Sequence, residues 1–298
     1  MTTARDLTAL STDGHPVHVE VYGPASAPPV VLAHGWTCNT TFWAEQIDAL
    51  TPDFRVIAYD QRGHGRSPHG PASTTALADD LEAVLATTLA PGEKAVIAGH
   101  SMGGMTIMSA AGRPRFEEHA AAALLCSTGS GRLVDESRVV PLLRESALRA
   151  RLTRSLLSTR APYGPVTPLS RKLIKYITMG PATPPARVAA ATRIVAACPR
   201  GPRADWAHVL DAVALDENVG RLTVPTAVIA GSVDRLTPLP HARRLAGELP
   251  HCTGLLLLPG MGHMTPMEAP EAVTQAIRDL AAAYLNPTSD RPATKETV

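Results

Sequence analysis

Six short segments of the chain are apolar at almost every position, and each ends in a small or polar residue. Such runs are typical of strands that are buried on both faces of a sheet. They span residues 28–35, 54–60, 94–101, 120–129, 226–234 and 253–263. The earlier segment 6–23 behaves differently, because its second half alternates valine with polar residues after the turn signal Asp13-Gly14. That pattern predicts a β-hairpin.

Amphipathic segments with helical spacing separate most of these strands. They span residues 40–50, 74–90, 102–112, 240–250 and 270–285. Strands that alternate with helices of this length form βαβ units, whose crossovers are right-handed and whose strands run parallel. The sequence therefore predicts an α/β fold built on a mostly parallel sheet.

One long segment, 131–220, interrupts this alternation because it has no convincing strand pattern. Helices are expected over 139–158, 170–180 and 186–198. An all-helical insertion between two strands predicts a cap over the carboxyl edge of the sheet. We expect a core domain made of residues 1–130 and 221–285, a helical cap at 131–220, and a disordered polar tail at 286–298.

The composition is that of an ordinary globular protein. The 298 residues are 45% hydrophobic and 18% charged, which excludes a disordered or collagen-like chain. A net charge of +1 and an aromatic content of 4% argue against nucleic-acid binding. No apolar window is long enough to span a membrane, and the first residues lack the apolar stretch of a signal peptide. With four cysteines and no CxxC spacing, we expect reduced thiols and a cytoplasmic location.

The strongest chemical signal is the pentapeptide GHSMG at 99–103, a G-x-S-x-G pattern between an expected strand and an expected helix. A sharp strand-to-helix turn needs glycine on both sides of the central residue. It presents the hydroxyl of Ser101 at the edge of the sheet, at a helix N-terminus that favours developing negative charge. Ser101 is therefore the candidate nucleophile.

A serine hydroxyl needs a general base, and the base needs an orienting acid. Asp234 and His263 each follow an expected strand, and the order Ser, Asp, His is that of a nucleophile-elbow hydrolase. Alone, Asp234 would be read as a turn cap and His263 as a loop histidine, but the combination favours a triad. Asp135 and Glu136 compete for the role of the acid.

Developing negative charge on the substrate oxygen needs donors. The segment His34-Gly35-Trp36 ends an earlier expected strand, and Gly35 lets the main chain approach a substrate. The main-chain N–H groups of Trp36 and Met102 are the candidate oxyanion-hole pair.

The chain resembles the α/β-hydrolase superfamily over residues 6–285, and four motifs in order carry the resemblance. They are His34-Gly35-Trp36 followed by Phe42-Trp43, DQRGHGRS at 60–67, GHSMGG at 99–104, and GSVD at 231–234 followed by Gly262-His263. The branch is that of capped serine esterases, lactonases and cofactor-free haloperoxidase-like perhydrolases. The resemblance implies an eight-stranded, mostly parallel sheet and no cofactor. Serine rather than aspartate at the elbow disfavours haloalkane dehalogenases and epoxide hydrolases.

Other chemistry has little support in the sequence. There is no phosphate-binding loop, dinucleotide-binding glycine pattern or HExxH motif. His64 and His69 lie in a loop without a nearby carboxylate, so we expect no metal site there. Arg62 and His64 belong to the 60–67 motif, which the resemblance makes structural.

Basic residues concentrate in the expected cap. Residues 131–203 hold fourteen lysines and arginines against three acidic residues, whereas the whole chain has 28 basic and 27 acidic residues. The remainder is therefore acidic. Two interpretations stay open. The arginines pair with acids of the main domain on a solvated surface, or they attract an anionic substrate, an acyl carrier or an anionic membrane surface.

Together these residues predict a serine hydrolase that cleaves carboxylic esters or lactones through an acyl-enzyme. The same machinery would serve a thioesterase, or a perhydrolase in which peroxide replaces water. A different class, a non-catalytic ligand-binding receptor on the same fold, is disfavoured because every catalytic position is intact. The expected partner is a small-molecule ester, lactone or thioester, with no nucleic acid.

Overall fold

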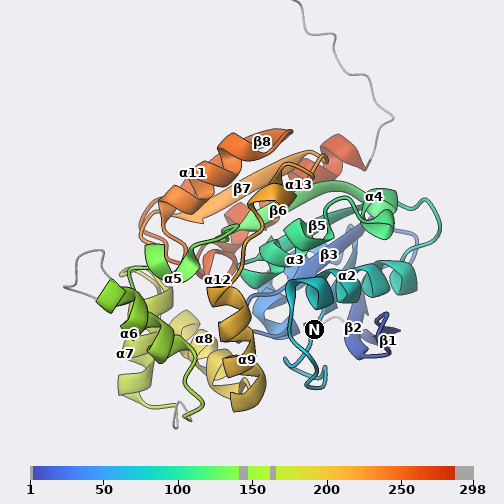
Figure 1. The fold of residues 1–298 in the computed structure, drawn as a ribbon. Coiled ribbons are helices and arrows are strands. Elements are labelled where there is room, and N and C mark those ends of the chain that lie inside the picture. The colour runs from blue at the N-terminus through green and yellow to red at the C-terminus, as the bar shows by residue number, and fades with distance from the viewer. Residues whose placement is uncertain (1–2, 141–146, 162–165, 286–298) are drawn as a thin grey trace, which may run out of the picture.

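A single eight-stranded sheet runs through the middle of the molecule (Figure 1). The computed structural model describes residues 3–140, 147–161 and 166–285. The strands are β1 (Arg5–Leu10), β2 (Pro16–Tyr22), β3 (Pro29–Ala33), β4 (Arg55–Tyr59), β5 (Ala95–His100), β6 (Ala120–Cys126), β7 (Thr226–Gly231) and β8 (Cys252–Leu258). Their spatial order is β1-β2-β4-β3-β5-β6-β7-β8. β1 and β2 form the expected hairpin, β2 pairs antiparallel with β4, and all other pairs are parallel. The predicted α/β fold is confirmed.

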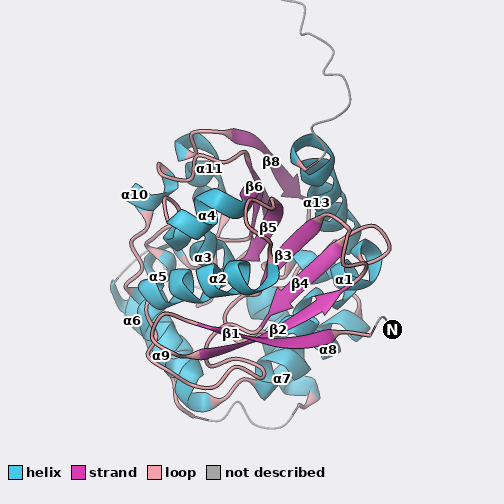
Figure 2. Ribbon diagram, turned by 90° about the vertical axis from the view of Figure 1, so that its right-hand side faces the viewer, coloured by secondary structure: helices cyan, strands magenta, loops and turns pink. Residues whose placement is uncertain are grey.

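Helices cover both faces of this sheet, and alternate strand residues face opposite layers. On β3, Val31 packs with the helices on one side, and Val30 packs with those on the other. The first layer contains α2 (Thr74–Thr88), α3 (Met102–Ala110), α4 (Pro114–His119) and α11 (Leu239–Glu248). The second contains the short helix η1 (Thr40–Trp43), α1 (Ala44–Leu50), α12 (Thr265–Glu268) and α13 (Pro270–Tyr284). Figure 2 shows the two layers on either side of the strands.

The segment between β6 and β7 is helical. It contains α5 (Leu133–Glu136), α6 (Ala147–Leu157), α7 (Pro168–Thr178), α8 (Pro185–Ala197), α9 (Arg200–Asp211) and α10 (Asp216–Val219). A single β-bridge between Gly131 and Ala214 joins the two ends of the insertion, and Leu215 N donates to Ser130 O at 2.7 Å. The chain therefore leaves the sheet and returns to it at one place.

Besides the short helices α4, α5, α10 and α12, which were not expected, the sequence prediction needs three corrections in this architecture. No helix was expected at the position of α9, which carries Pro202 in its first turn, where a proline is tolerated. The helix expected over 139–158 is wrong at its start, since Val139 and Val140 are not helical. Residues 141–146 of that helix, and the tail 286–298, lie outside the described residues.

The third correction concerns β8, which was expected to be buried on both faces. Leu256 and Leu257 are 44% and 38% exposed. β8 has a neighbour on one side only, because it ends the sheet. A run of leucines looks the same in sequence whether its strand is central or at an edge. None of the described helices combines the length and the apolarity needed to cross a bilayer.

Candidate active site

Ser101 occupies the turn between β5 and α3, in a strained conformation. Its φ of +52° lies in the left-handed region that side chains other than glycine rarely adopt. The positions of Gly99 and Gly103 have no room for a side chain. A Cβ on Gly99 would lie 2.4 Å from the main chain of Gly103, and a Cβ on Gly103 would lie 2.1 Å from Ala33 O. The turn predicted from GHSMG is present, and its tightness explains both glycines.

Main-chain and side-chain hydrogen bonds hold this turn in place. Ser101 N donates to Cys126 O on the neighbouring strand at 2.9 Å, and Thr128 Oγ1 donates to Ser101 O at 2.7 Å. The side chain of Ser101 is buried at the N-terminus of α3. These bonds hold the main chain of Ser101 at the positive end of α3.

His263 and Asp234 meet at the carboxyl ends of β8 and β7. His263 Nδ1 donates to Asp234 Oδ2 at 2.8 Å, and both side chains are buried. Asp234 Oδ1 also accepts from Leu236 N and Thr237 N at 2.8 and 3.0 Å. Thr237 Oγ1 donates to Asp234 Oδ2 at 2.8 Å and lies 3.2 Å from His263 Nδ1. This arrangement fixes the imidazole with its Nε2 as the free nitrogen.

The competing acids do not contact His263. Glu136 forms ion pairs with Arg132, Arg244 and His241 at 3.3, 2.7 and 3.3 Å. Asp135 is exposed, and its main-chain carbonyl accepts from Arg149 at 2.7 Å. Of the three carboxylates considered in the sequence, Asp234 is the one hydrogen-bonded to His263.

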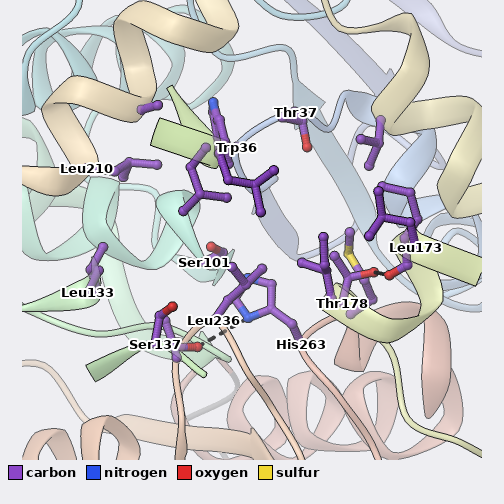
Figure 3. Close-up of a pocket in the computed structure, with 18 of the residues that line it drawn as sticks. Trp36, Thr37, Ser101, Leu133, Ser137, Leu173, Thr178, Leu210, Leu236 and His263 are labelled. Atoms are coloured by element: carbon purple, nitrogen blue, oxygen red, sulfur yellow. Dashed lines mark hydrogen bonds between the residues drawn. The ribbon is translucent and has the colours of Figure 1, made fainter. Parts of the chain in front are cut away.

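Ser101 and His263 line one cavity of about 230 Å³ that lies between the sheet edge and the helical insertion. Figure 3 shows both side chains facing it, with Leu133, Leu210 and Leu236 around them. The helices α6 and α7 contribute mainly apolar lining residues: Leu156, Leu157, Leu173, Ile174 and Ile177. The volume is below the roughly 300 Å³ at which most ligand pockets begin, so the cavity suits a small apolar group.

Of the two residues whose amides are proposed for the oxyanion hole, Trp36 lines this cavity and Met102 directly follows the lining residue Ser101. The indole Nε1 of Trp36 donates to Arg203 O of α9 at 3.0 Å. Met102 is the first residue of α3, so its N–H has no partner within the helix. Within the described ranges, the N–H groups of Trp36 and Met102 donate to no acceptor. Both remain available for a substrate oxygen.

His100, which the sequence analysis passed over, supports the loop that carries His263. Its ring lies 4.5 Å from Phe42 and 5.0 Å from His263 between centroids, and its Nε2 donates to His263 O at 2.9 Å. Burial and the neighbouring His263 hold the pKa of His100 well below its usual value, so the ring is neutral. A Cβ on Gly35 would lie 2.6 Å from His100 Nδ1, which explains why position 35 is also a glycine.

Hydrogen bonds from the insertion also hold the loop that carries His263. Thr178 O, at the end of α7, accepts from His263 N at 2.8 Å and from Met264 N at 3.1 Å. The buried carboxylate of Glu268 accepts from Gly262 N at 2.9 Å through Oε1, and from Gly180 N and Thr183 Oγ1 at 2.6 and 2.7 Å through Oε2. No local motif in the sequence marks this network, because its members are about 85 residues apart in the chain.

The main chains of these two segments are in direct contact. A Cβ on Gly180 would lie 1.9 Å from Gly260 O, and a Cβ on Gly262 would lie 2.6 Å from the main chain of Met179. The loop that carries His263 and the end of α7 therefore form one packed unit.

Arg62 and His64 of the 60–67 motif, and His69 just after it, have structural partners. Arg62 is buried and forms ion pairs with Asp80 and Asp13, both at 2.6 Å. His64 Nε2 accepts from Thr37 N at 3.1 Å, whereas His69 contacts Asp205 at 3.0 Å. Neither histidine belongs to a group of metal-type ligands. In the described part of the chain one such group exists, at Asp6, His18 and Glu20, and Arg66 pairs with Asp6 there at 2.8 Å.

Comparison with known proteins places this geometry in context. Residues 30–276 match the alpha/beta hydrolase family. RutD from Variovorax paradoxus strain S110, a protein named for carbamate hydrolysis, is 31% identical over 278 residues, which cover 91% of this chain and 98% of RutD. The bifunctional esterase/perhydrolase DCH of Acinetobacter calcoaceticus is 26% identical, covering 88% of this chain and 95% of DCH. Among solved structures, a thermophilic esterase from Thermogutta terrifontis superposes with a TM-score of 0.75 at 26% identity, covering 94% of this chain and 99% of the esterase.

Proposed function

Because the chain belongs to the α/β-hydrolase family, we propose that it is a serine hydrolase of carboxylic esters, lactones included. The observation that carries the proposal is the cavity that Ser101 and His263 share, with Asp234 hydrogen-bonded to His263 at 2.8 Å. A strained serine, a histidine with a free Nε2 and a buried carboxylate are the parts that acyl transfer requires.

The reaction follows from these positions. Ser101 Oγ attacks the substrate carbonyl while His263 Nε2 takes the hydroxyl proton. Asp234 keeps the proton on Nδ1 and stabilises the imidazolium. The N–H groups of Trp36 and Met102 bind the oxyanion, and each such donor is typically worth about 10²–10³ in rate. His263 then gives its proton to the leaving alcohol, and water activated by the same histidine releases the acid from the acyl-enzyme.

The lining of the cavity favours an ester with a small apolar acyl group. Apolar side chains make up most of its wall, and the polar ones are mainly hydroxyl groups such as Thr37, Ser137 and Thr178. A carbamate carries an amide-like nitrogen that loses its hydrogen bonds in such a wall. Carbamate hydrolysis and perhydrolysis, for which two relatives are named, are competing reactions that the same triad could perform. Thioester hydrolysis, considered in the sequence analysis, is a third.

Activity assays distinguish these reactions. We expect p-nitrophenyl acetate and butyrate to be hydrolysed with a burst of p-nitrophenol, and a fluorophosphonate to label Ser101 alone. Lactone, thioester, carbamate and peracid-forming assays, run at equal concentration, then rank the reactions by kcat/KM. If no acyl substrate is turned over and no label is attached, the enzyme proposal is wrong and a binding protein on the same fold replaces it.

A further inference from the structure

The outer helices of the insertion expose apolar side chains in two aligned rows. On α6, Leu148, Leu152 and Leu156 recur every four residues and therefore share one face of the helix. On α7, Leu169, Leu173 and Tyr176 are spaced by four and three residues and also share one face. The most exposed of them are Leu169 at 75% and Leu148 at 55%. We call these six side chains the cap face. Figure 1 shows α6 and α7 at the outer end of the insertion, away from the sheet.

The segment that carries the cap face contains charged residues of one sign only. Residues 147–178 contain seven arginines and lysines and no aspartate or glutamate. Some of these cations have partners: Arg154 pairs with Asp211 at 2.5 Å and Arg160 with Asp205 at 2.8 Å. Arg151, Arg171 and Lys172 are exposed and, within the described ranges, form no ion pair. Asp211 and Asp205 lie on α9 of the insertion, whereas the sequence analysis expected acids of the main domain; Arg187, which pairs with Glu45 at 3.0 Å, is a cap arginine that meets that expectation.

The cap face is continuous with the cavity that holds Ser101. Leu156 and Leu173 belong to both, since each lines the cavity and is also 40% or more exposed. Leu156 and Leu173 therefore connect the exposed rows of the cap face with the apolar wall of the cavity.

We propose that the cap face binds an anionic lipid surface peripherally. The leucines enter the interface between headgroups and acyl chains, while Arg151, Arg171 and Lys172 contact the headgroups. Helices with an apolar face and a basic border lie in membrane interfaces in this way. An acidic protein would satisfy the charges but would leave the protruding leucines without an apolar partner. Delivery of an apolar ester from the lipid to Ser101 rests on the proposed function; the binding itself does not.

The binding is tested with the full-length protein and extruded vesicles. Vesicles of phosphatidylcholine with 30% phosphatidylglycerol are compared with pure phosphatidylcholine in sedimentation assays, using the Ser101→Ala variant so that lipid is not hydrolysed. We expect at least tenfold stronger binding to the anionic vesicles, and loss of that difference in 0.5 M salt, where the Debye length falls below about 5 Å. No binding to either vesicle, or equal binding to both, overturns the proposal.

Paired variants locate the contact. Leu148→Ser with Leu169→Ser, and separately Arg171→Gln with Lys172→Gln, should each weaken binding at least tenfold, because these residues are exposed and do not line the cavity. The matched controls are Leu10→Ser on β1 and Arg221→Gln with Arg243→Gln, which are exposed elsewhere. Thermal unfolding verifies that every variant is folded. Binding that the cap variants leave unchanged overturns the proposal.

Two further measurements identify other occupants and separate the proposals. Sedimentation velocity without lipid should give a monomer at all concentrations; a dimer that Leu148→Ser with Leu169→Ser abolishes would assign the cap face to a second copy of the chain and overturn the proposal. Soluble p-nitrophenyl butyrate is assayed in the same cap variants on the wild-type background. If vesicle binding follows the cap face but no variant or wild type hydrolyses any ester, the proposed function fails and the lipid surface stands.

Discussion

The main-chain carbonyl of Thr178, the last residue of α7, accepts a hydrogen bond from the N–H of His263 at 2.8 Å. The insertion therefore does more than cover the cavity: it fixes the main chain of the proposed general base. Glu268 adds to this connection, because its two carboxylate oxygens bind Gly262 N on one side and Gly180 N on the other. A change in the insertion should thus affect the chemical step as well as substrate binding.

Glu268→Gln should lower kcat more than it raises KM. The amide NH₂ would face at least one of the N–H groups that the carboxylate now accepts, leaving a buried donor unpaired at a cost of about 1–3 kcal/mol. We expect a lower melting temperature, a fall in kcat of about tenfold or more, and a displaced acid limb in the pH profile of kcat. Glu271→Gln, at an exposed position of α13, is the control. If the melting temperature falls while kcat and the pH profile of kcat stay unchanged, Glu268 has a structural role only.

Ser101→Ala and Ser101→Gly should both reduce the kcat for ester hydrolysis by several orders of magnitude. The two variants should nevertheless differ in stability. Triad members act as a unit, so loss of the hydroxyl removes the whole machinery. Glycine also relieves the strain of the positive φ, which costs about 1–3 kcal/mol for other residues. We expect Ser101→Gly to melt at a higher temperature than Ser101→Ala. Equal melting temperatures would mean that the turn stores no strain.

Asp234→Asn should reduce kcat by roughly 10³–10⁴ with little change in KM, because the amide cannot hold the required tautomer of His263. Asp135→Asn and Glu136→Gln should keep near-normal kcat, since neither side chain contacts His263. Steady-state kinetics with p-nitrophenyl butyrate compares all three. Normal turnover in Asp234→Asn together with loss in Asp135→Asn would transfer the role of the acid.

Stability should fall on the acid side because His34 and His64 are buried in their neutral forms. Each donates from Nδ1 to a carbonyl and accepts a main-chain N–H at Nε2, so a second proton would break a hydrogen bond. Burial lowers the pKa of His34 to about 4 and that of His64 to about 3, against about 6.5 for the unfolded chain. The unfolded state therefore binds more protons below pH 6.5, and the free energy of unfolding decreases from there down to about pH 4 for His34 and about pH 3 for His64.

Urea unfolding between pH 7.5 and 4.5 measures this slope. His64→Gln removes one titrating group, so it should be less stable at pH 7.5 but lose less on acidification. His69→Gln, at an exposed position, should keep the wild-type slope. A wild-type slope in His64→Gln would assign the acid sensitivity to other groups.

The strands could be predicted from the sequence because continuous apolar runs mark a sheet that is covered on both faces. Seven of the eight strands have that environment or belong to the hairpin, and the exception, β8, shows the limit of the pattern. Its leucines are partly exposed because the sheet ends there, and the position of a strand in a sheet depends on tertiary pairing. α9 was missed because it also depends on tertiary contacts. Its Trp206 is buried against the 60–67 loop and donates a hydrogen bond to Arg62 O at 2.8 Å.

The candidate site was predictable as far as each residue has a local signal. Ser101 lies between two glycines, and Asp234 and His263 each follow a strand. The residues that position them have no such signal. His100 acts through the His263 carbonyl, and Thr178 and Glu268 act across the boundary between insertion and core. Their roles arise from contacts between distant segments, which composition and spacing do not encode.

The packing of Gly180 against Gly260, and of Gly262 against Met179, has a consequence for exchanging parts between related hydrolases. These main chains are in contact and leave no room for a side chain, so both segments of a chimera must come from the same parent protein. A chimera that takes its insertion from a relative, with crossovers near Gly131 and Ala214, would combine a foreign end of α7 with the resident histidine loop. Crossovers that leave residues 178–183 in place should keep the catalytic geometry and still replace the walls contributed by α6 and the first turns of α7. Recombination at those points would alter which acyl groups fit while the chemistry stays with the parent.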